Sequence, residues 1–489
     1  MPGFHVEHFG CRAARADGEA IAERLRALCA TSPMKADVVV VNTCSVTAEA
    51  DRAARAFIRR TRRRNPEAKI VVTGCYAQRA PEELASMAGV AAVVGNSHKA
   101  LVPEIAQALA FGVEPQASRP AALVPVASLL TAHTPQPSAE AMRAPIWADE
   151  LFAHSFLERG PDLGPVAPGA QTRPNLKIQE GCGNRCTFCV IPFTRGPSRS
   201  LPFATVMRHV EGFVAAGGRE LVLSGINLGQ WGRDLAEGPH RTLAGLVRKI
   251  FETTALARLR LSSIEPMDWN ADMIALMREF GGQRLARHAH LPLQSGSDAV
   301  LRRMHRRYRP WHYAEKVEAL FDAAGPALTL GADVMVGFPG ESDREFEETF
   351  DFLRALPFGY LHLFPFSARP GTPGWALQKA SPVAAKAVAE RSSALRALAA
   401  EKTLAHRRRF VGSMLAVLTL HTPAEAAGRG CTAALAENFL PVELAGRFER
   451  NQLLRVRAHG LNAEGALQCL PEAASAPLQA ASAVDALQA

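Results

Sequence analysis

The chain has 489 residues, 48% hydrophobic and 21% charged, which is enough material for several globular domains. Lysine and arginine exceed aspartate and glutamate by 56 to 47, and this excess favours an anionic partner. No stretch reaches the roughly 18 uncharged apolar residues of a membrane span, and the first residues lack a signal-peptide pattern. Nine cysteines, an odd number, argue against a disulfide scaffold. We therefore expect a cytoplasmic protein, with no membrane partner, whose clustered cysteines bind metal or take part in catalysis.

Residues 1–117 alternate between strand and helix patterns. Short β-branched runs at 37–41 and 69–73 enclose an Ala- and Arg-rich stretch of helical length at 47–64. A strand–helix–strand unit of this size requires parallel pairing and a right-handed crossover. Further elements are expected as strands at 4–9 and 90–94 and a helix at 18–30. Together they predict an α/β domain built on a doubly wound parallel sheet.

Residues 118–170 are rich in Pro and Ala and predict a linker or insertion, with one short helix at 148–157.

Residues 171–402 again alternate between strand and helix patterns. The strand patterns lie at 175–179, 220–224, 258–263, 288–293, 327–335 and 360–366, separated by amphipathic helices such as 201–216 and 343–356. Six β/α units in series predict a parallel, curved sheet, a (β/α)6 partial TIM barrel.

After a last helix at 383–406, a β-rich domain is expected over residues 403–470. Strand patterns at 415–420, 440–444 and 453–458, separated by Gly and Asn, predict a small β-barrel. The final residues, 471–489, are rich in Ala and Ser and predict a disordered tail.

The strongest functional signal is a run of three cysteines, Cys182, Cys186 and Cys189, directly after the first strand of the predicted partial barrel. In parallel β/α architectures, active sites form at this end of the strands. Three thiolates with C-x3-C-x2-C spacing can hold three irons of a [4Fe–4S] cluster and leave the fourth open to another ligand. Structural zinc is the alternative, but it needs four ligands, and no cysteine follows until Cys431. The spacing therefore favours the cluster.

A second set of cysteines is distributed along the first domain. Cys11, Cys44 and Cys75 each follow a predicted strand at its C-terminal end. Because these ends share one edge of a parallel sheet, the three thiols can converge there and hold a second cluster. Three buried thiols are the alternative. The remaining cysteines are interpreted as core or incidental positions: Cys29 on a helix, and Cys431 and Cys469 in the β-rich domain.

These motifs resemble the radical S-adenosylmethionine (SAM) methylthiotransferases. The C-x3-C-x2-C run looks like the radical SAM signature, with Phe188 as the aromatic residue before its last cysteine. The resemblance covers nearly everything outside the insertion and the tail. It is specific, because these segments match in order: NTCSVTAEAD, VVTGCYAQ, LKIQEGCGNRCTFCVIPFTRG, LSGINLGQWG, SSIEP, HLPLQSGSD, GADVMVGFPGE and FPFSARPGTP. The resemblance implies SAM and two [4Fe–4S] clusters as cofactors and a C-terminal TRAM domain, a small RNA-binding barrel.

Within this family, residues 43–47 followed by Ala50 and Asp51 most resemble the branch that acts on N6-threonylcarbamoyladenosine in tRNA. The lead into the cysteine loop, KIQEG, agrees with that branch, although Ala14 stands where the branch commonly has Asn. The resemblance implies insertion of a methylthio group at C2 of this nucleoside at position 37, beside the anticodon. It also implies tRNA, an electron donor such as flavodoxin or ferredoxin, and a sulfur source as partners. The alternatives are isopentenyladenosine in tRNA, a ribosomal-protein aspartate, or a non-catalytic iron–sulfur RNA-binding protein.

Glycine and polar residues at the ends of later strands are candidate SAM contacts. With Phe188, the candidates are Gly225, Asn227, Ser263, Glu265, Gln294 and Gly337. By resemblance, the turn after the second strand binds the amino-acid part of SAM, and the turn GFPGE bounds its adenine. Ordinary β/α turns are the alternative. We assign no side chain as general base.

Arginines gather in three places, around the 47–64 helix, at 302–309 with interleaved aromatics, and at 407–409. Arginine with aromatic side chains suits phosphates and unstacked bases, whereas a solvated helix face is the alternative. The candidate RNA-binding residues are Arg59, Arg60, Arg62, Arg63, Arg306, Arg307 and Arg408.

Overall fold

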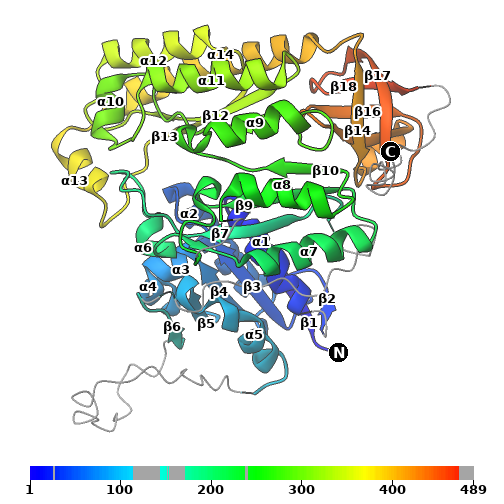
Figure 1. Cartoon of the computed structure of the whole chain (residues 1–489). Coiled ribbons are helices and arrows are strands. Elements are labelled where there is room, and N and C mark those ends of the chain that lie inside the picture. The colour runs from blue at the N-terminus through cyan, green and yellow to red at the C-terminus, as the bar shows by residue number, and fades with distance from the viewer. Residues whose placement is uncertain (26–27, 114–143, 151, 153–170, 237–240, 473–489) are drawn as a thin grey trace. The chain divides into compact units, whose positions relative to one another are not determined.

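The computed structural model describes residues 1–25, 28–113, 144–150, 152, 171–236 and 241–472 (Figure 1). It divides into two compact units, Met1–Gly160 with Phe193–Gly196, and Pro161–Pro192 with Pro197–Ala489. Within the described residues, no helix combines the length and apolar character needed to cross a bilayer. The predicted linker and tail lie almost entirely outside the described residues.

The first unit is built on a six-stranded parallel sheet with the strand order β2-β1-β3-β4-β5-β6. Its strands are β1 (Gly3–His8), β2 (Cys29–Ala30), β3 (Val38–Thr43), β4 (Lys69–Gly74), β5 (Val90–Gly95) and β6 (Ile146–Trp147). β3 is buried along its whole length, as its run of valines predicts for a strand covered on both faces.

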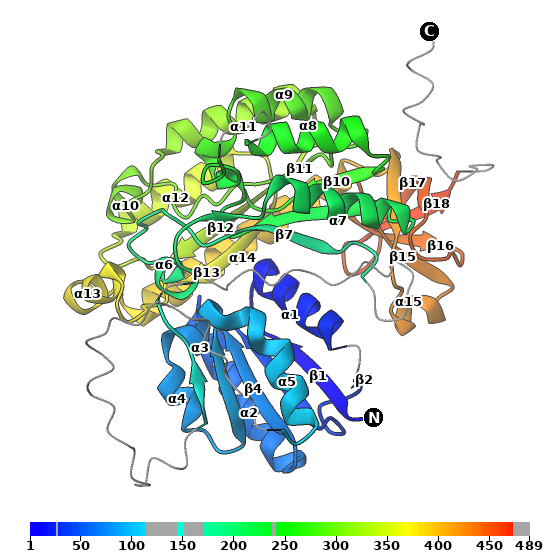
Figure 2. The same cartoon turned by 60° about the horizontal axis from the view of Figure 1, so that its bottom comes forward.

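Helices cover both faces of this sheet, which confirms the doubly wound prediction (Figure 2). On one face pack α1 (Arg12–Arg24) and α5 (Val102–Ala110), and on the other α2 (Ala48–Arg64), α3 (Cys75–Arg79) and α4 (Pro81–Ala85), with the 3-10 helix η1 (Asn96–Leu101) after β5. α2 begins where the sequence predicts, because the Thr47 hydroxyl accepts the N–H of Ala50 as a helix cap.

Two predicted helices are corrected. The helix expected at 18–30 begins six residues earlier, and Cys29 lies in β2 rather than in a helix. Gly18 lies inside α1 and packs against His8, since a Cβ there would lie 1.9 Å from His8 Nδ1. Of the helix expected at 148–157, residues 148–150 and 152 are not helical, and the others lie outside the described residues. The nearby β6 pairs with β5 instead.

The second unit begins with six parallel strands, which confirms the six predicted β/α units. They form two sheets, β10-β9-β7-β8 and β11-β12-β13, joined by the parallel bridge Leu259–Leu285. The strands are β7 (Asn175–Glu180), β9 (Glu220–Gly225), β10 (Arg258–Leu261), β11 (His288–His290), β12 (Thr329–Val336) and β13 (Phe358–Pro365), with β8 (Arg199–Ser200) antiparallel at the edge.

Helices connect these strands in series. In chain order they are α6 (Ile191–Arg195), α7 (Phe203–Ala215), η4 (Leu228–Gln230), α8 (Leu243–Thr253), η5 (Pro266–Asp268), α9 (Ala271–Phe280), α10 (Asp298–Arg303), α11 (Pro310–Ala324), α12 (Asp343–Ala355), α13 (Pro373–Ala380) and α14 (Ala385–Arg408). α12 begins at a capping box between Ser342 and Glu345, the two residues that flank its first turn. The two sheets together form a half-barrel. It is open along one side, between the edge strands β8 and β13.

A closed five-stranded barrel, β14-β15-β16-β18-β17, follows the half-barrel and confirms the predicted small β-barrel (Figure 1). Its elements are β14 (Met414–Thr419), α15 (Ala424–Gly428), β15 (Cys431–Ala436), β16 (Pro441–Ala445), β17 (Leu453–Leu461) and β18 (Leu467–Pro471). The sequence pattern missed β15 and β18, whose runs of apolar residues are short and lack clear alternation.

The C-terminal barrel packs against the amino ends of the half-barrel strands through the turn between β15 and β16. Glu437 accepts hydrogen bonds from Arg287 (2.8 Å), and Asn438 donates to the Ala327 carbonyl (3.1 Å). The centroids of the Phe439 and His288 rings lie 4.4 Å apart. Because this barrel occupies the amino ends, the chemistry is expected at the opposite, carboxyl ends of the strands.

Candidate functional site

Three cysteines meet at the carboxyl edge of the sheet in the first unit. Cys44 and Cys75 directly follow β3 and β4 and are buried, whereas Cys11 is exposed at the start of α1. Burial, with smaller contributions from Cys11 and Cys75, raises the pKa of the Cys44 thiol to about 12. The parallel sheet thus brings these three thiols, distant in sequence, close enough to interact.

The surroundings of these thiols fit a bound group. A Cβ on Gly10 would lie 2.2 Å from Cys44 Cβ, so only glycine lets the first strand end this close to Cys44. Asn42 Oδ1, Thr73 Oγ1 and Asn96 Oδ1 are buried at the same edge and have no hydrogen-bond partner within the described part of the chain. Buried polar atoms normally have partners, and a group held by the three thiols would bring some.

Cys75 has two hydrogen-bond donors on its sulfur. Asn96 Nδ2 lies 3.4 Å and Arg195 Nε 3.3 Å from Cys75 Sγ. Arg195 also donates to Asp17 (3.0 Å), and Lys99 pairs with the same fully buried carboxylate. Sequence reasoning missed Arg195 because it follows the other cysteine motif, 120 residues from Cys75.

The segment after Cys44 is held by a small polar network. Arg79 donates to Ser45 Oγ (2.7 Å) and to Asp51 Oδ2 (2.8 Å), and Ser45 donates to Asp51 Oδ1 (3.1 Å). Asp51 is 4% exposed although it lies near the start of α2. These residues of the NTCSVTAEAD motif therefore shape the loop that carries Cys44.

The second cysteine set lies in the loop between β7 and α6. The loop is anchored at Thr187, whose N–H donates to the Met304 carbonyl (3.1 Å) and whose carbonyl accepts from Gly374 N–H (2.7 Å). Burial raises the pKa of Cys189 to about 12, with smaller contributions from Cys186 and Cys182. The three thiols of the predicted motif therefore lie together.

Neither cysteine set has the compactness of a single-ion site. Within the described ranges, the only three ligand atoms of His, Cys, Asp or Glu that lie within 4.8 Å of one another belong to His290, Asp333 and His362. Sulfurs bound to one zinc at about 2.3 Å lie within about 4 Å of one another.

The carboxyl ends of β9, β10 and β11 carry polar atoms that fit a bound SAM. The Asn227 N–H donates to Gln179 Oε1 (2.8 Å), and Asn227 Nδ2 lies 3.9 Å from Cys182 Sγ. A Cβ on Gly225 would lie 2.9 Å from Gln179, so this glycine makes room for Gln179. Buried atoms without a partner among the described residues are Asn227 Oδ1, Ser224 Oγ, Ser262 Oγ and Gln294 Oε1. A polar ligand at this rim would supply their missing partners.

The surroundings of Arg306 differ from those expected of an RNA-binding residue. It is 6% exposed, and its guanidinium donates to Cys186 Sγ (3.2 Å), to Tyr308 (3.0 Å) and to Glu265. The prediction that Arg306 binds RNA is therefore wrong, because these partners occupy the guanidinium. Arg306 instead links the predicted SAM contact Glu265 to the cysteine loop.

The other predicted SAM contacts differ in burial and in backbone conformation. Ser263 and Phe188 are half-buried, at the end of β10 and in the cysteine loop. Gln294 has a positive φ of 67°, a strained conformation for a residue with a side chain. The Gly337 N–H donates to Glu341 (3.0 Å), and a Cβ there would lie 2.5 Å from Val388. The turn around Gly337 is thus shaped by its own hydrogen bond and by α14.

The remaining predicted RNA-binding arginines are exposed. Arg59, Arg60, Arg62 and Arg63 lie on the last turns of α2, which starts beside Cys44. At about 1.5 Å per residue, they are roughly 20 Å along the helix from that end. Arg307 and Arg408 are exposed in the second unit.

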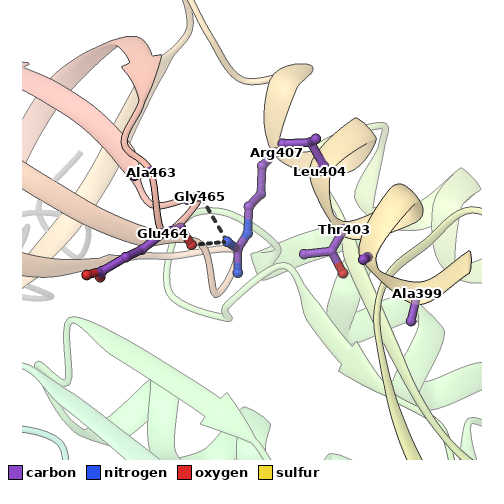
Figure 3. A pocket seen from close by; sticks show the side chains of 8 residues that line it. Ala399, Thr403, Leu404, Arg407, Ala463, Glu464 and Gly465 are labelled. Carbon is purple, nitrogen blue, oxygen red and sulfur yellow. Dashed lines mark hydrogen bonds between the residues drawn. The ribbon is translucent and has the colours of Figure 1, made fainter. Parts of the chain in front are cut away.

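Beside Arg408, Arg407 borders an open hollow of about 360 Å³ between α14 and the turn from β17 to β18 (Figure 3). Its guanidinium donates to the Gly465 carbonyl (2.8 Å). None of the predicted site residues lines this hollow.

Comparison with known proteins assigns both units. Residues 3–95 match the family described as "Uncharacterized protein family UPF0004", and residues 176–353 match the Radical SAM superfamily. The "Threonylcarbamoyladenosine tRNA methylthiotransferase MtaB" of Aquifex aeolicus is 32% identical over 86% of this chain and 90% of its own. The protein of that name from Bacillus subtilis is 36% identical over 69% of this chain and 67% of its own. A "tRNA-2-methylthio-N(6)-dimethylallyladenosine synthase" of Cereibacter sphaeroides is 34% identical over 84% of this chain and 86% of its own.

Proposed function

Since the chain belongs to the radical SAM tRNA methylthiotransferases, we propose that it inserts a methylthio group at C2 of N6-threonylcarbamoyladenosine at position 37 of tRNA. The relative from Aquifex aeolicus, matched over nearly its whole length, carries the name of this nucleoside. Residues 43–51 also resemble that branch of the family. A dimethylallyladenosine is the second candidate, because a relative named for it is 34% identical.

We infer that Cys182, Cys186 and Cys189 hold the [4Fe–4S] cluster of the radical SAM site. We infer a second cluster at Cys11, Cys44 and Cys75. When bound, the radical SAM cluster would supply the electron that cleaves SAM, and the cluster of the first unit would supply the sulfur. Support comes from two triads of thiols, each placed at a carboxyl strand edge among buried polar atoms without partners in the described part of the chain.

The chain's own residues then bind and orient SAM at the rim. Asn227 is positioned by Gln179 (2.8 Å), and Glu265 by Arg306. We expect Asn227 to bind the amino-acid part of SAM and Glu265 and Gln294 to face its ribose. The C-terminal barrel and exposed arginines would bind the tRNA. The electron donor, a flavodoxin or ferredoxin, and a sulfur source complete the proposed system.

Iron content tests the two clusters. Anaerobically reconstituted protein is expected to hold about eight irons per chain, and each Cys→Ala triple variant, of Cys182/Cys186/Cys189 or of Cys11/Cys44/Cys75, about four. Sulfide should fall in parallel. No iron in the first variant would mean that the N-terminal thiols bind no cluster, and the sulfur-transfer proposal would have to be given up.

Nucleoside mass spectrometry tests the substrate. Reconstituted protein, SAM, dithionite and tRNA carrying threonylcarbamoyladenosine should give the methylthio product, and tRNA carrying dimethylallyladenosine should not. Product only from the second tRNA would move the chain to the other branch. Binding of tRNA without any consumption of SAM would support the non-catalytic alternative.

A further inference from the structure

Three side chains on neighbouring strands of the half-barrel form a compact set that the proposed chemistry does not use. His290 Nε2 lies 3.1 Å from Asp333 Oδ2, and His362 Nδ1 lies 3.2 Å from Asp333 Oδ1. Asp333 and His362 are directly paired across β12 and β13, so the strand register itself brings them together. Each carboxylate oxygen thus serves one imidazole.

Hydrogen bonds hold this set firmly on its inner side. Tyr360 Oη lies 3.0 Å from His290 Nδ1 and 2.8 Å from His288 Nε2. Burial alone would raise the pKa of Asp333, but the hydrogen bonds of His290 and His362 bring it well below its usual range. The carboxylate is therefore ionised and can fix the orientation of both rings.

His362 is the member of the set that a ligand can reach. Its side chain is 58% exposed, against 6% for His290 and 26% for Asp333. Nδ1 is directed to Asp333, and Nε2 has no hydrogen-bond partner among the residues that the structure describes. With Nδ1–H donated to the Asp333 carboxylate, the ring can donate Nε2–H to an anion in its doubly protonated, imidazolium form.

The set lies beside the predicted SAM rim. The N–H of Gln294 donates to the Asp333 carbonyl (2.8 Å), and the N–H of Ile264, next to Glu265, donates to the His290 carbonyl (3.1 Å). A base presented to SAM at this rim would therefore bring its N6 substituent close to His362. The substituent of threonylcarbamoyladenosine ends in a carboxylate, whereas a dimethylallyl group is uncharged and apolar.

We propose that His362, held in place by Asp333, binds the carboxylate of the threonylcarbamoyl group and so selects this nucleoside over one with an apolar substituent. The inference rests on the proposed substrate and names the residue that recognises it. An imidazolium and a carboxylate form a charge-assisted hydrogen bond. An apolar substituent would instead leave polar groups of this set desolvated and unpaired, which is the stronger source of discrimination.

The test uses full-length reconstituted protein and two substrates. One is tRNA carrying threonylcarbamoyladenosine, and the other is the same tRNA with the threonyl carboxylate converted to a methyl ester. For His362→Gln and Asp333→Asn we expect a KM at least tenfold higher for the acid, with kcat nearly unchanged. On the ester, wild type and both variants should show the same high KM. His209→Gln, on α7, is the matched control and should behave as wild type.

Several outcomes would overturn the inference. An equal loss of kcat/KM on the acid and on the ester would mean that His362 only supports the fold. Iron content and tRNA-independent cleavage of SAM would report such a loss of structure separately. No loss on the acid would remove His362 from recognition. Two histidines and a carboxylate are also a ligand set for a divalent ion, so stoichiometric zinc binding abolished by His362→Gln would replace carboxylate recognition with a metal site.

Failure of the proposed function gives a different result. In that case wild-type protein leaves threonylcarbamoyladenosine unmodified and converts dimethylallyladenosine. If wild type converts threonylcarbamoyladenosine and the His362 variants do so equally well, the proposed function stands and only the role of His362 fails.

Discussion

At the scale of single residues, Arg195 and Cys75 form a contact that ties two distant motifs together. The Arg195 guanidinium is fully buried, lies 3.3 Å from Cys75 Sγ and is balanced by Asp17, which Lys99 also neutralises. A buried arginine that donates a hydrogen bond to a cysteine sulfur fixes the position of that sulfur. Hydrogen bonds of this kind orient the ligands of metal sites and tune them.

We therefore expect Arg195→Lys to weaken iron retention at the N-terminal site. Lysine keeps the positive charge beside Asp17 but cannot reproduce the planar fork of arginine toward Cys75. Loss of such an outer partner typically costs about 10- to 100-fold in metal affinity. The measurement is iron released to a chelator in the Cys182/Cys186/Cys189→Ala background, where only the proposed N-terminal cluster reports.

Arg208→Lys, at an exposed position of α7, is the matched control for this experiment. It should retain iron as the parent variant does. Equal retention of iron by Arg195→Lys would show that the hydrogen bond to Cys75 does not contribute to iron binding. Arg195 would then serve only to pair with Asp17.

At the scale of elements, α2 shows how helix geometry constrains a functional reading. Its cap at Thr47 lies just after Cys44, and 17 residues later it ends in Arg62, Arg63 and Arg64. Because a helix rises about 1.5 Å per residue, these arginines cannot lie near the thiols of the same unit. If they bind RNA, they bind a part of the tRNA away from these thiols.

The variant Arg59/Arg60/Arg62/Arg63→Ala tests this role. We expect weaker tRNA binding and a salt dependence reduced by up to about 0.7–0.9 in log–log slope for each phosphate that the arginines no longer neutralise. Cleavage of SAM without tRNA should be unchanged, since none of these four arginines belongs to the proposed SAM site at Cys182, Cys186 and Cys189 in the second unit. Fluorescence anisotropy of labelled tRNA at several salt concentrations measures both affinity and slope.

A control with three exposed cations on other helices, Arg278, Arg344 and Lys386 changed to Ala, separates specific contact from net charge. If both variants bind tRNA more weakly in proportion to the charge removed, the α2 arginines are a solvated helix face and make no specific contact with RNA.

At the scale of the whole second unit, one buried carboxylate joins the half-barrel to the C-terminal barrel. Glu220 accepts hydrogen bonds from Arg173 (3.0 Å), Arg258 (3.2 Å) and Arg260 (2.9 Å). Arg258 and Arg260 also donate to carbonyls of Ala416 and Ala436 in the barrel, each at 3.2 Å. Burial alone would raise the pKa of Glu220, but Arg260, Arg258 and Arg173 lower it to about 2.

Glu220→Gln should destabilise this unit strongly, because it removes the buried carboxylate that Arg258 and Arg260 share. Removing one partner of a buried ion pair costs about 3–5 kcal/mol in the free energy of unfolding. Since the folded pKa lies below the unfolded value of about 4.3, the carboxylate's contribution is present at neutral pH and disappears as pH falls from about 4.5 toward 2. Urea unfolding at several pH values measures both effects.

Glu211→Gln, exposed on α7, is the control and should change the free energy of unfolding by no more than about 0.5 kcal/mol. A Glu220→Gln protein as stable as wild type, with the same acid sensitivity, would show that the network contributes nothing to holding the two barrels together.

The sequence by itself determined most of the elements and the cysteine motifs of this protein. Runs of valine, a threonine cap and Gly or Pro at loop positions are local signals, and they predicted the parallel sheets and the small barrel. The C-x3-C-x2-C spacing is local as well, and the strand ends predicted where Cys11, Cys44 and Cys75 would meet. These inferences hold because a residue's place on a strand depends mainly on its near neighbours.

The tertiary structure alone decided which side chains face one another. It buried Arg306 beside Cys186, placed Gly18 within α1 and brought Arg195 to Cys75. It also assembled His290, Asp333 and His362 from three strands. Such contacts depend on strand register, helix length and crossover path, which join residues far apart in the chain. No pattern within a short window of sequence encodes them, because the same arginine or histidine fits a solvated face or a buried site equally well until its neighbours are known.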